Sequence, residues 1–275
     1  MTGSLNGRLS WPTNPVREFE APKPRLDPER VFGHQRRRTL TPEEVGHLLA
    51  ACRPFYRDHF LIQVGTGLRS GELLGLRRRR VFPELGRIEV IEVRYEAGRF
   101  GRGFKAEPKS PASVRVVPMC EQVSQAIGRQ LPAGARPDDL VFPGPGGRNG
   151  IPRGARTPLS THNLRRVYQA AVAAADEELA HLDLHGPHDL RHTFATWLED
   201  AGIPSRVIDE LMGHAGGRRQ GGGASGSPMG RVYRETTPTM LARVTAALDE
   251  RIGRAMAVAG NLPRDAEGWT GTKAG

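Results

Sequence analysis

A chain of 275 residues, 37% of them hydrophobic, has room for one large or two modest domains, and this composition excludes disorder throughout. Its 40 basic and 30 acidic residues give a net charge of +10, which favours polyanionic partners, above all nucleic acid, over apolar or acidic ones. Two cysteines are too few for a disulfide framework or a metal cluster, and neither an apolar run of about 18 residues nor a secretory signal occurs, so a cytoplasmic protein without a membrane anchor is expected.

The first segment, residues 1–38, is predicted to be a linker or an arm. It contains five prolines, lacks a sustained apolar period and ends in the basic stretch HQRRR. A solvated tail is the alternative that this composition leaves open.

The following stretch predicts three helices. In TLTPEEVGHLL, Thr41 is a good N-cap, Pro42 suits the first helical position, and Glu44 completes a capping box. RDHFLIQVGTGLRSGELLGL then predicts a buried helix, a turn at Gly65 and Gly67, and a short helix after the turn.

Strands are predicted in the middle of the chain. Alternating apolar residues indicate one strand over 87–95, and SVRVVPM indicates another over 113–119. The polar segment 96–112 between them is long enough to form an extended β-hairpin tip. Helices are expected over about 121–131 and 160–180.

The rest of the chain predicts three further helices. HDLRHTFATWLEDAGI predicts a helix ending at Gly202, and PSRVIDELMGH predicts a short helix capped by Ser205 and closed by Gly213. Residues 216–230 are flexible by composition. An amphipathic helix follows, with Leu241, Val244, Leu248 and Ile252 on its apolar face, and it could pack on its own domain or on a neighbouring copy. The order of elements predicts an α+β fold, mostly helical with a small antiparallel sheet.

The helix that begins HDLRH carries the most unusual group of side chains. His188 and His192 share a face as zinc ligands do, but no third ligand is apparent and Arg191 would place a cation beside the metal. His188 and Arg191 also share a face, and a helix N-terminus favours an anion there. The planar guanidinium of arginine matches phosphate oxygens. These residues therefore favour an anion site that also moves a proton, with a polar helix end of no function as the alternative.

Five motifs occur along the chain in a fixed order. They are TGLRSGELLGL, PKS in a strand connection, HDLRHTFAT, LMGH and a tyrosine soon after it. From about Thr39 to Met256 the chain thereby resembles the catalytic domain of the tyrosine recombinases, or phage integrases. The resemblance implies that a tyrosine attacks a DNA phosphodiester, stays joined to the 3′ phosphate and releases a 5′ hydroxyl. Because the covalent intermediate keeps the bond energy, rejoining requires no ATP, and the resemblance implies no metal or other cofactor.

The resemblance also implies which residues act on the phosphate. The nucleophile would be Tyr233, which lies 19 positions after His214, further than is common in the family. Arg69 and Arg191 match the two arginines that stabilise the charge of the pentacoordinate phosphorane, and His214 matches a further donor to the same oxygens.

Two proton transfers complete the implied reaction. His188 matches the residue that accepts the proton of the tyrosine, a task that suits an imidazole near pH 7. Lys109 in EPKS matches the lysine that protonates the leaving 5′ oxygen, and Lys105, four residues earlier, is the alternative.

The front of the chain departs from the family pattern. Family members usually carry a separate helical DNA-binding domain before the catalytic domain, but only about 38 residues precede the match here. We therefore expect an N-terminally truncated site-specific recombinase or integrase of a mobile element. Its expected parts are an arm over 1–38 with a possible remnant of the DNA-binding domain, a catalytic domain over 39–257 and a flexible tail over 258–275.

The resemblance implies double-stranded DNA as the partner, with further copies of the chain and accessory directionality factors assembled on it. Two other functions stay open. One is an inactive DNA-binding remnant of a mobile element, which would bind DNA without forming a covalent product. The other is relaxation of supercoils by cleavage and rejoining, as in type IB topoisomerases.

Overall fold

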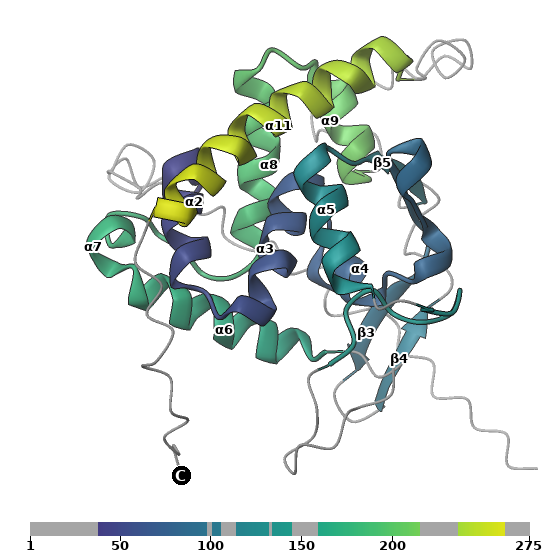
Figure 1. Ribbon diagram of the computed structural model, residues 1–275, viewed down its shortest axis with the longest axis horizontal. Helices are drawn as coiled ribbons and strands as arrows, with labels where there is room; N and C mark the ends of the chain where they lie inside the picture. The colour runs from purple at the N-terminus through teal and green to yellow at the C-terminus, as the bar shows by residue number, and fades with distance from the viewer. Residues whose placement is uncertain are drawn as a thin grey trace, which may run out of the picture. The chain divides into compact units, whose positions relative to one another are not determined.

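The computed structural model describes residues 38–97, 101–105, 114–131, 134–144, 159–214 and 236–261, drawn in colour in Figure 1. The chain divides into two units, Met1–Gln35 and Arg36–Gly275, and every described residue lies in the second unit. For residues 95–97 and 101–105 only the backbone is described.

Three helices open the described region: α2 (Pro42–Ala51), α3 (Pro54–Thr66) and α4 (Ser70–Gly75). The predicted capping box is confirmed, because Thr41 and Glu44 exchange backbone-to-side-chain hydrogen bonds of 3.2 and 2.6 Å. The predicted turn forms at Gly67, whose φ of +64° suits glycine and where a Cβ would lie 2.5 Å from the Phe194 ring. Gly65 does not take part, since it lies inside α3, where it allows the side chain of Val123 to approach.

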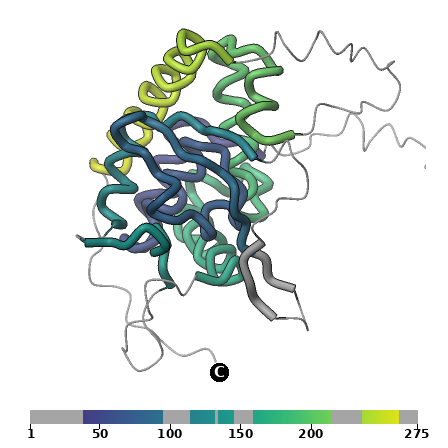
Figure 2. Tube along the Cα trace, turned by 90° about the vertical axis from the view of Figure 1, so that its right-hand side faces the viewer, coloured from purple at the N-terminus to yellow at the C-terminus, as the bar shows by residue number. Residues whose placement is uncertain are grey.

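Two small antiparallel sheets follow. The first has the strand order β1 (Val81–Phe82), β2 (Arg87–Val90), β5 (Arg115–Pro118), and the second pairs β3 (Val93–Ala97) with β4 (Gly101–Lys105). The 3₁₀ helices η1 (Arg78–Arg80) and η2 (Pro83–Leu85) flank β1. In Figure 2 the blue segments that carry β1 and β2 face the viewer in front of the helices.

The single strand expected over 87–95 is wrong, because the chain leaves the first sheet after Val90 and starts the second at Val93. Helix α4 explains where β3 lies. A Cβ on Gly71 would be 2.7 Å from the carbonyl oxygen of Arg94, and one on Gly75 would be 3.0 Å from the nitrogen of the same residue. The two glycines therefore let the backbone of β3 pack directly on α4.

The second half supplies α5 (Glu121–Gln130), α6 (Thr161–Ala174), α7 (Asp176–Leu179), α8 (His188–Asp200) and α9 (Ser205–Met212). The helix expected over 160–180 is interrupted at Ala175, whose φ and ψ of −107° and 38° are not helical. Gly213 closes α9 in the left-handed conformation as predicted, whereas Ser205 is its first helical residue and the N-cap is Pro204.

The last described helix, α11 (Pro238–Asn261), packs on its own domain. In Figure 1 it runs past α2 and α8, and its carbonyl at Ala255 would be 2.6 Å from a Cβ on Gly46 of α2. Its buried side chains are Val244, Leu248, Ile252, Ala255 and Ala259. The helix thus includes the first residues of the segment expected to be a tail. In the described part of the chain, no helix has both the length and the apolar character needed to span a membrane.

Helix α8 is held firmly at the centre of the helical layer. The Trp197 side chain is buried and donates its indole N–H to the carbonyl of Leu40 at 2.9 Å, and the amide of Leu40 donates to Thr193 Oγ1 at 3.1 Å. The chain segment that enters the domain is thereby fixed to the helix that carries His188 and Arg191. The predicted fold, mostly helical with a small antiparallel sheet, is confirmed.

Candidate active site

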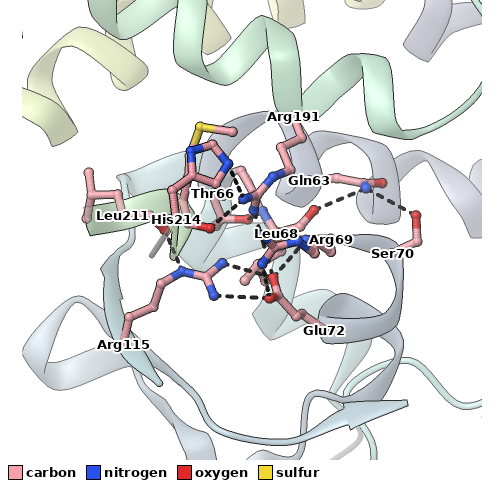
Figure 3. Close-up of polar contacts among 12 residues, drawn as sticks. Gln63, Thr66, Leu68, Arg69, Ser70, Glu72, Arg115, Arg191, Leu211 and His214 are labelled. Carbon is pink, nitrogen blue, oxygen red and sulfur yellow. Dashed lines mark hydrogen bonds and ion pairs between the residues drawn. The ribbon is translucent and has the colours of Figure 1, made fainter. Parts of the chain in front are cut away.

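Arg191 connects three parts of the chain. Its side chain is 1% exposed, and its guanidinium donates hydrogen bonds to the carbonyl oxygens of Gly67 and Met212 (Figure 3). Its Nη2 also lies 3.3 Å from Nε2 of His214. Helix α8 is thus tied to the glycine turn before α4 and to the end of α9.

Arg69 is held at the start of α4 by Glu72. The amide of Arg69 donates to one carboxylate oxygen of Glu72 at 2.8 Å, and its guanidinium donates to the other at 2.9 Å. Glu72 is buried, with 2% of its side chain exposed, whereas the Arg69 side chain is 39% exposed. The guanidinium of Arg69 is therefore accessible to solvent while it is paired with a buried carboxylate, and it is available to bind an anionic ligand.

Arg115 is a third arginine of this cluster, and the sequence did not reveal it. It extends from β5, donates to both oxygens of Glu72 at 3.1 and 2.9 Å, and donates its Nε–H to the carbonyl of Leu211 at 2.5 Å. The one signal in the sequence is the strand alternation, which places Arg115 on the same face as the buried Val117. An arginine on the buried face of a strand requires a partner inside the fold.

The cluster carries more positive than negative charge. Burial raises the pKa of Glu72, but the hydrogen bonds and charge of Arg115 and Arg69 outweigh that effect and lower its pKa below the usual value. Burial, with the neighbouring Arg69, lowers the pKa of Arg191 to about 9, so this arginine is still a cation at pH 7. Three guanidinium groups share one carboxylate, and the excess charge suits a phosphate.

His188 is the first residue of α8, and its side chain is exposed. Partial desolvation, then the neighbouring His192 and Arg191, lowers the pKa of His188. Its ring meets that of His192 edge to face, with 4.8 Å between the centroids. A histidine with a lowered pKa is neutral near pH 7, so His188 is suited to accept a proton. Among the described residues, no third histidine, cysteine or carboxylate joins the pair as a metal ligand would.

His214 lies directly after the glycine that ends α9. Its Nδ1 is 3.0 Å from Oδ1 of Asp209, which leaves Nε2 facing Arg191. The left-handed conformation of Gly213 turns the chain so that this imidazole lies beside the arginine cluster.

Asp189 fixes the loop that leads into α8. This carboxylate is fully buried and accepts hydrogen bonds from the amides of His185 and Gly186 at 2.6 and 2.8 Å and from Arg38 at 2.8 Å. A groove of about 510 Å³ borders this loop, and its lining includes Arg38, His162, Arg165, His185 and His188. Asp189 also lines the groove and pairs with Arg38, so Arg165 is the other arginine that this lining contributes.

A family model described as "Phage integrase family" matches residues 38–218 of the chain. The chain belongs to the phage integrase family. This family membership confirms the resemblance carried by the five sequence motifs.

Named relatives in this family include tyrosine recombinases. The chain is 31% identical over 190 residues to tyrosine recombinase XerD of Pseudomonas aeruginosa, covering 65% of this chain and 54% of that protein. It is 32% identical over 181 residues to tyrosine recombinase XerA of Thermococcus kodakarensis, with the same two coverages, 65% and 54%. The chain therefore spans about half the length of these curated relatives.

The solved structure of a transposon integrase has a similar fold. The Tn1549 transposon integrase in complex with circular intermediate DNA has a TM-score of 0.54 and 26% identity, covering 76% of this chain and 66% of that chain.

Of the residues that the phage integrase resemblance implied, Arg69 and Arg191 lie at Glu72, and His214 lies beside Arg191. His188 lies one helical turn before Arg191. Lys109 and Tyr233 lie outside the described residues. The backbone of Lys105 lies in β4 opposite Val93. The motifs did not assign Glu72, Arg115 or Asp189 to the site, although Glu72, three positions after Arg69, could be expected to pair with it, as it does.

Proposed function

We propose that residues 39–257 form the catalytic domain of a site-specific DNA recombinase or integrase that cleaves and rejoins DNA through a 3′-phosphotyrosyl intermediate. The observation that carries the proposal is the convergence of Arg69, Arg191 and His214 on one place, where three arginines share the single carboxylate of Glu72. Such an excess of fixed positive charge suits the added negative charge of a phosphorane. Membership of the phage integrase family supports the assignment.

In the proposed reaction, the phenol oxygen of Tyr233 attacks the scissile phosphorus. The new bond joins this oxygen to phosphorus, and the bond from phosphorus to the 5′ oxygen breaks. The proton of the phenol passes to His188, and the 5′ oxygen receives a proton from Lys109, with Lys105 as the alternative. Attack by the 5′ hydroxyl of another strand reverses these steps and releases the tyrosine. Neither direction requires a cofactor.

Double-stranded DNA is the proposed substrate. Arg165 in the groove beside His188 is a cation that a neighbouring phosphate can contact, and the name of the similar Tn1549 structure records a complex with DNA. Further copies of the chain and accessory directionality factors are the proposed partners on DNA, because strand exchange joins ends held by different copies. A cytoplasmic location stays a prediction.

Covalent trapping tests the proposal. The chain and its Tyr233→Phe variant would be incubated with nicked duplexes taken from either side of its own gene, denatured and separated on a gel. We expect a DNA-linked band with the unaltered chain and none with Tyr233→Phe, because phenylalanine has no hydroxyl to attack phosphorus. Tyr56→Phe, which removes the same atom from the buried face of α3, is the matched control and should form the band.

The outcomes separate the competing functions. DNA binding without a covalent band from the unaltered chain would support the inactive remnant. A band together with relaxation of supercoiled plasmid, but no joining between two sites, would support a topoisomerase-like activity.

A further inference from the structure

Arg115 and Arg191 hold two successive carbonyl groups at the end of α9. The Nε–H of Arg115 donates to Leu211 O from the side of β5, and Nη2 of Arg191 donates to Met212 O from the side of α8. The last carbonyls of a helix have no partner within the helix, and cations are favourable there. His214 follows two residues later, so the two arginines determine where its imidazole lies.

The other end of the Arg115 side chain neutralises Glu72. Both carboxylate oxygens accept from its guanidinium, in a bidentate contact whose two side chains are 3% and 2% exposed. A buried carboxylate that lacks such a partner attracts the nearest cations. The nearest ones here are Arg69, already bound at 2.9 Å, and Arg191, at 4.0 Å.

We infer that Arg115 is a positioning residue for the phosphate site: it occupies Glu72 and spaces α4 from the end of α9, so that Arg69, Arg191 and His214 stay directed at the phosphate. This role rests on the proposed strand-transfer function. Because only 3% of the Arg115 side chain is exposed, we assign it a role through Glu72 and not through contact with the DNA.

Arg115→Met and the double variant Arg115→Met/Glu72→Gln test this role. Methionine fills much of the volume but leaves Glu72 to draw on Arg69 and Arg191, so single-turnover formation of the phosphotyrosyl product at saturating DNA should slow by about 100-fold. Glutamine removes the unpaired charge, and the double variant should regain about tenfold of that loss. The affinity for DNA should change by less than about threefold, because the Arg115 side chain is buried.

Arg129→Met is the matched control. Arg129 also pairs with a carboxylate, Asp58 at 2.7 Å, but on α5, and its loss should leave the rate unchanged. Arg115→Lys keeps the charge and the fold while losing the bidentate contact, and it should slow the reaction by about tenfold. Chemical denaturation of every variant corrects each rate for unfolded protein.

A readout without catalysis keeps the inference separate from the proposed function. The amide of His214 donates to Asp209 O at 3.0 Å, and its hydrogen exchange in Arg115→Met should be at least about tenfold faster, with no change in Arg129→Met. If the unaltered chain forms no phosphotyrosyl product, the proposed function fails and the exchange data alone decide the role of Arg115. If hydrogen exchange of the His214 amide is unchanged in Arg115→Met, Arg115 does not set the position of the end of α9. If the unaltered chain is active and Arg115→Met reacts equally fast, the proposed neutralisation of Glu72 is wrong. The same holds if Arg115→Met is no slower than the double variant.

Discussion

Two groups of arginines in this domain differ in how far they are neutralised. The run Arg77–Arg80 is the denser one in the sequence, and its side chains are matched by Glu92, Glu89 and Asp138, while Arg78 donates to the carbonyl of Val81. Arg69, Arg115 and Arg191 are spread over 123 positions of the chain and share Glu72. The spread group keeps the positive charge that an anion can use.

The comparison shows that the number of arginines in a motif does not identify an anion site. Arg77 lies 2.7 Å from Glu92, which also contacts Arg79, and Arg80 lies 3.1 Å from Glu89. The three carboxylates offset three of the four positive charges of the run, whereas Glu72 offsets one of the three charges of the spread group. What distinguishes a site is the balance of charge after folding.

The largest expected difference comes from the same substitution in each group. Arg191→Lys loses the planar contact to Gly67 O and Met212 O and should slow single-turnover cleavage by about 10²- to 10³-fold. Arg79→Lys should change the rate by less than about twofold at saturating DNA, because the Arg79 contacts lie outside the site. Trapping of the phosphotyrosyl product measures both. Equal losses in the two variants would refute the distinction between the groups.

A smaller effect is expected when a carboxylate that pairs with the run Arg77–Arg80 is removed. Glu92→Gln removes a carboxylate shared by Arg77 and Arg79, so nonspecific DNA affinity should rise several-fold and its salt dependence should steepen by a slope of about 1. The cleavage rate at saturating DNA should not change. Filter binding over a series of salt concentrations measures the slope.

Glu199→Gln supplies the control for net charge, since it removes one exposed carboxylate at the far end of α8. If Glu199→Gln steepens the salt dependence as much as Glu92→Gln does, total charge and not local balance governs binding.

The parts of the fold that obey local rules could be predicted from the sequence. The capping box of Thr41 and Glu44 depends on residues three apart, and the turns at Gly67 and Gly213 depend on one residue that accepts a positive φ. The strand expected over 87–95 is interrupted because of a contact with α4, where Gly71 and Gly75 let the backbone of Arg94 approach that helix closely. Nothing within the strand itself encodes that contact.

The residues of the site likewise fall into those that local motifs identify and those that only the folded chain brings together. Motifs identify Arg69, Arg191 and His214, and the structure brings these three together. The contact of Arg115 with Glu72 joins residues 43 positions apart, and that of Arg38 with Asp189 joins residues 151 apart. Such contacts follow from strand register and helix packing, so the local pattern gives no sign of them. The roles of Lys109 and Tyr233 stay predictions.

The smallest expected effect sharpens the role of charge at the edge of the site, at His188. Because its pKa is lowered from the usual value of 6.5, His188 stays neutral further into acid, and the cleavage rate should reach half its maximum below pH 6.5 as pH falls. His192→Ala removes one of the groups that lower this pKa, so the midpoint should move up toward 6.5, whereas His181→Ala, which removes a histidine paired with Glu44, should leave it in place. Single-turnover rates measured from pH 5 to 8, the range in which an unperturbed histidine titrates, give the midpoint. If His192→Ala lowers the midpoint, or if His181→Ala shifts it equally, the pKa of the base that titrates in this range is not set by neighbouring residues on α8.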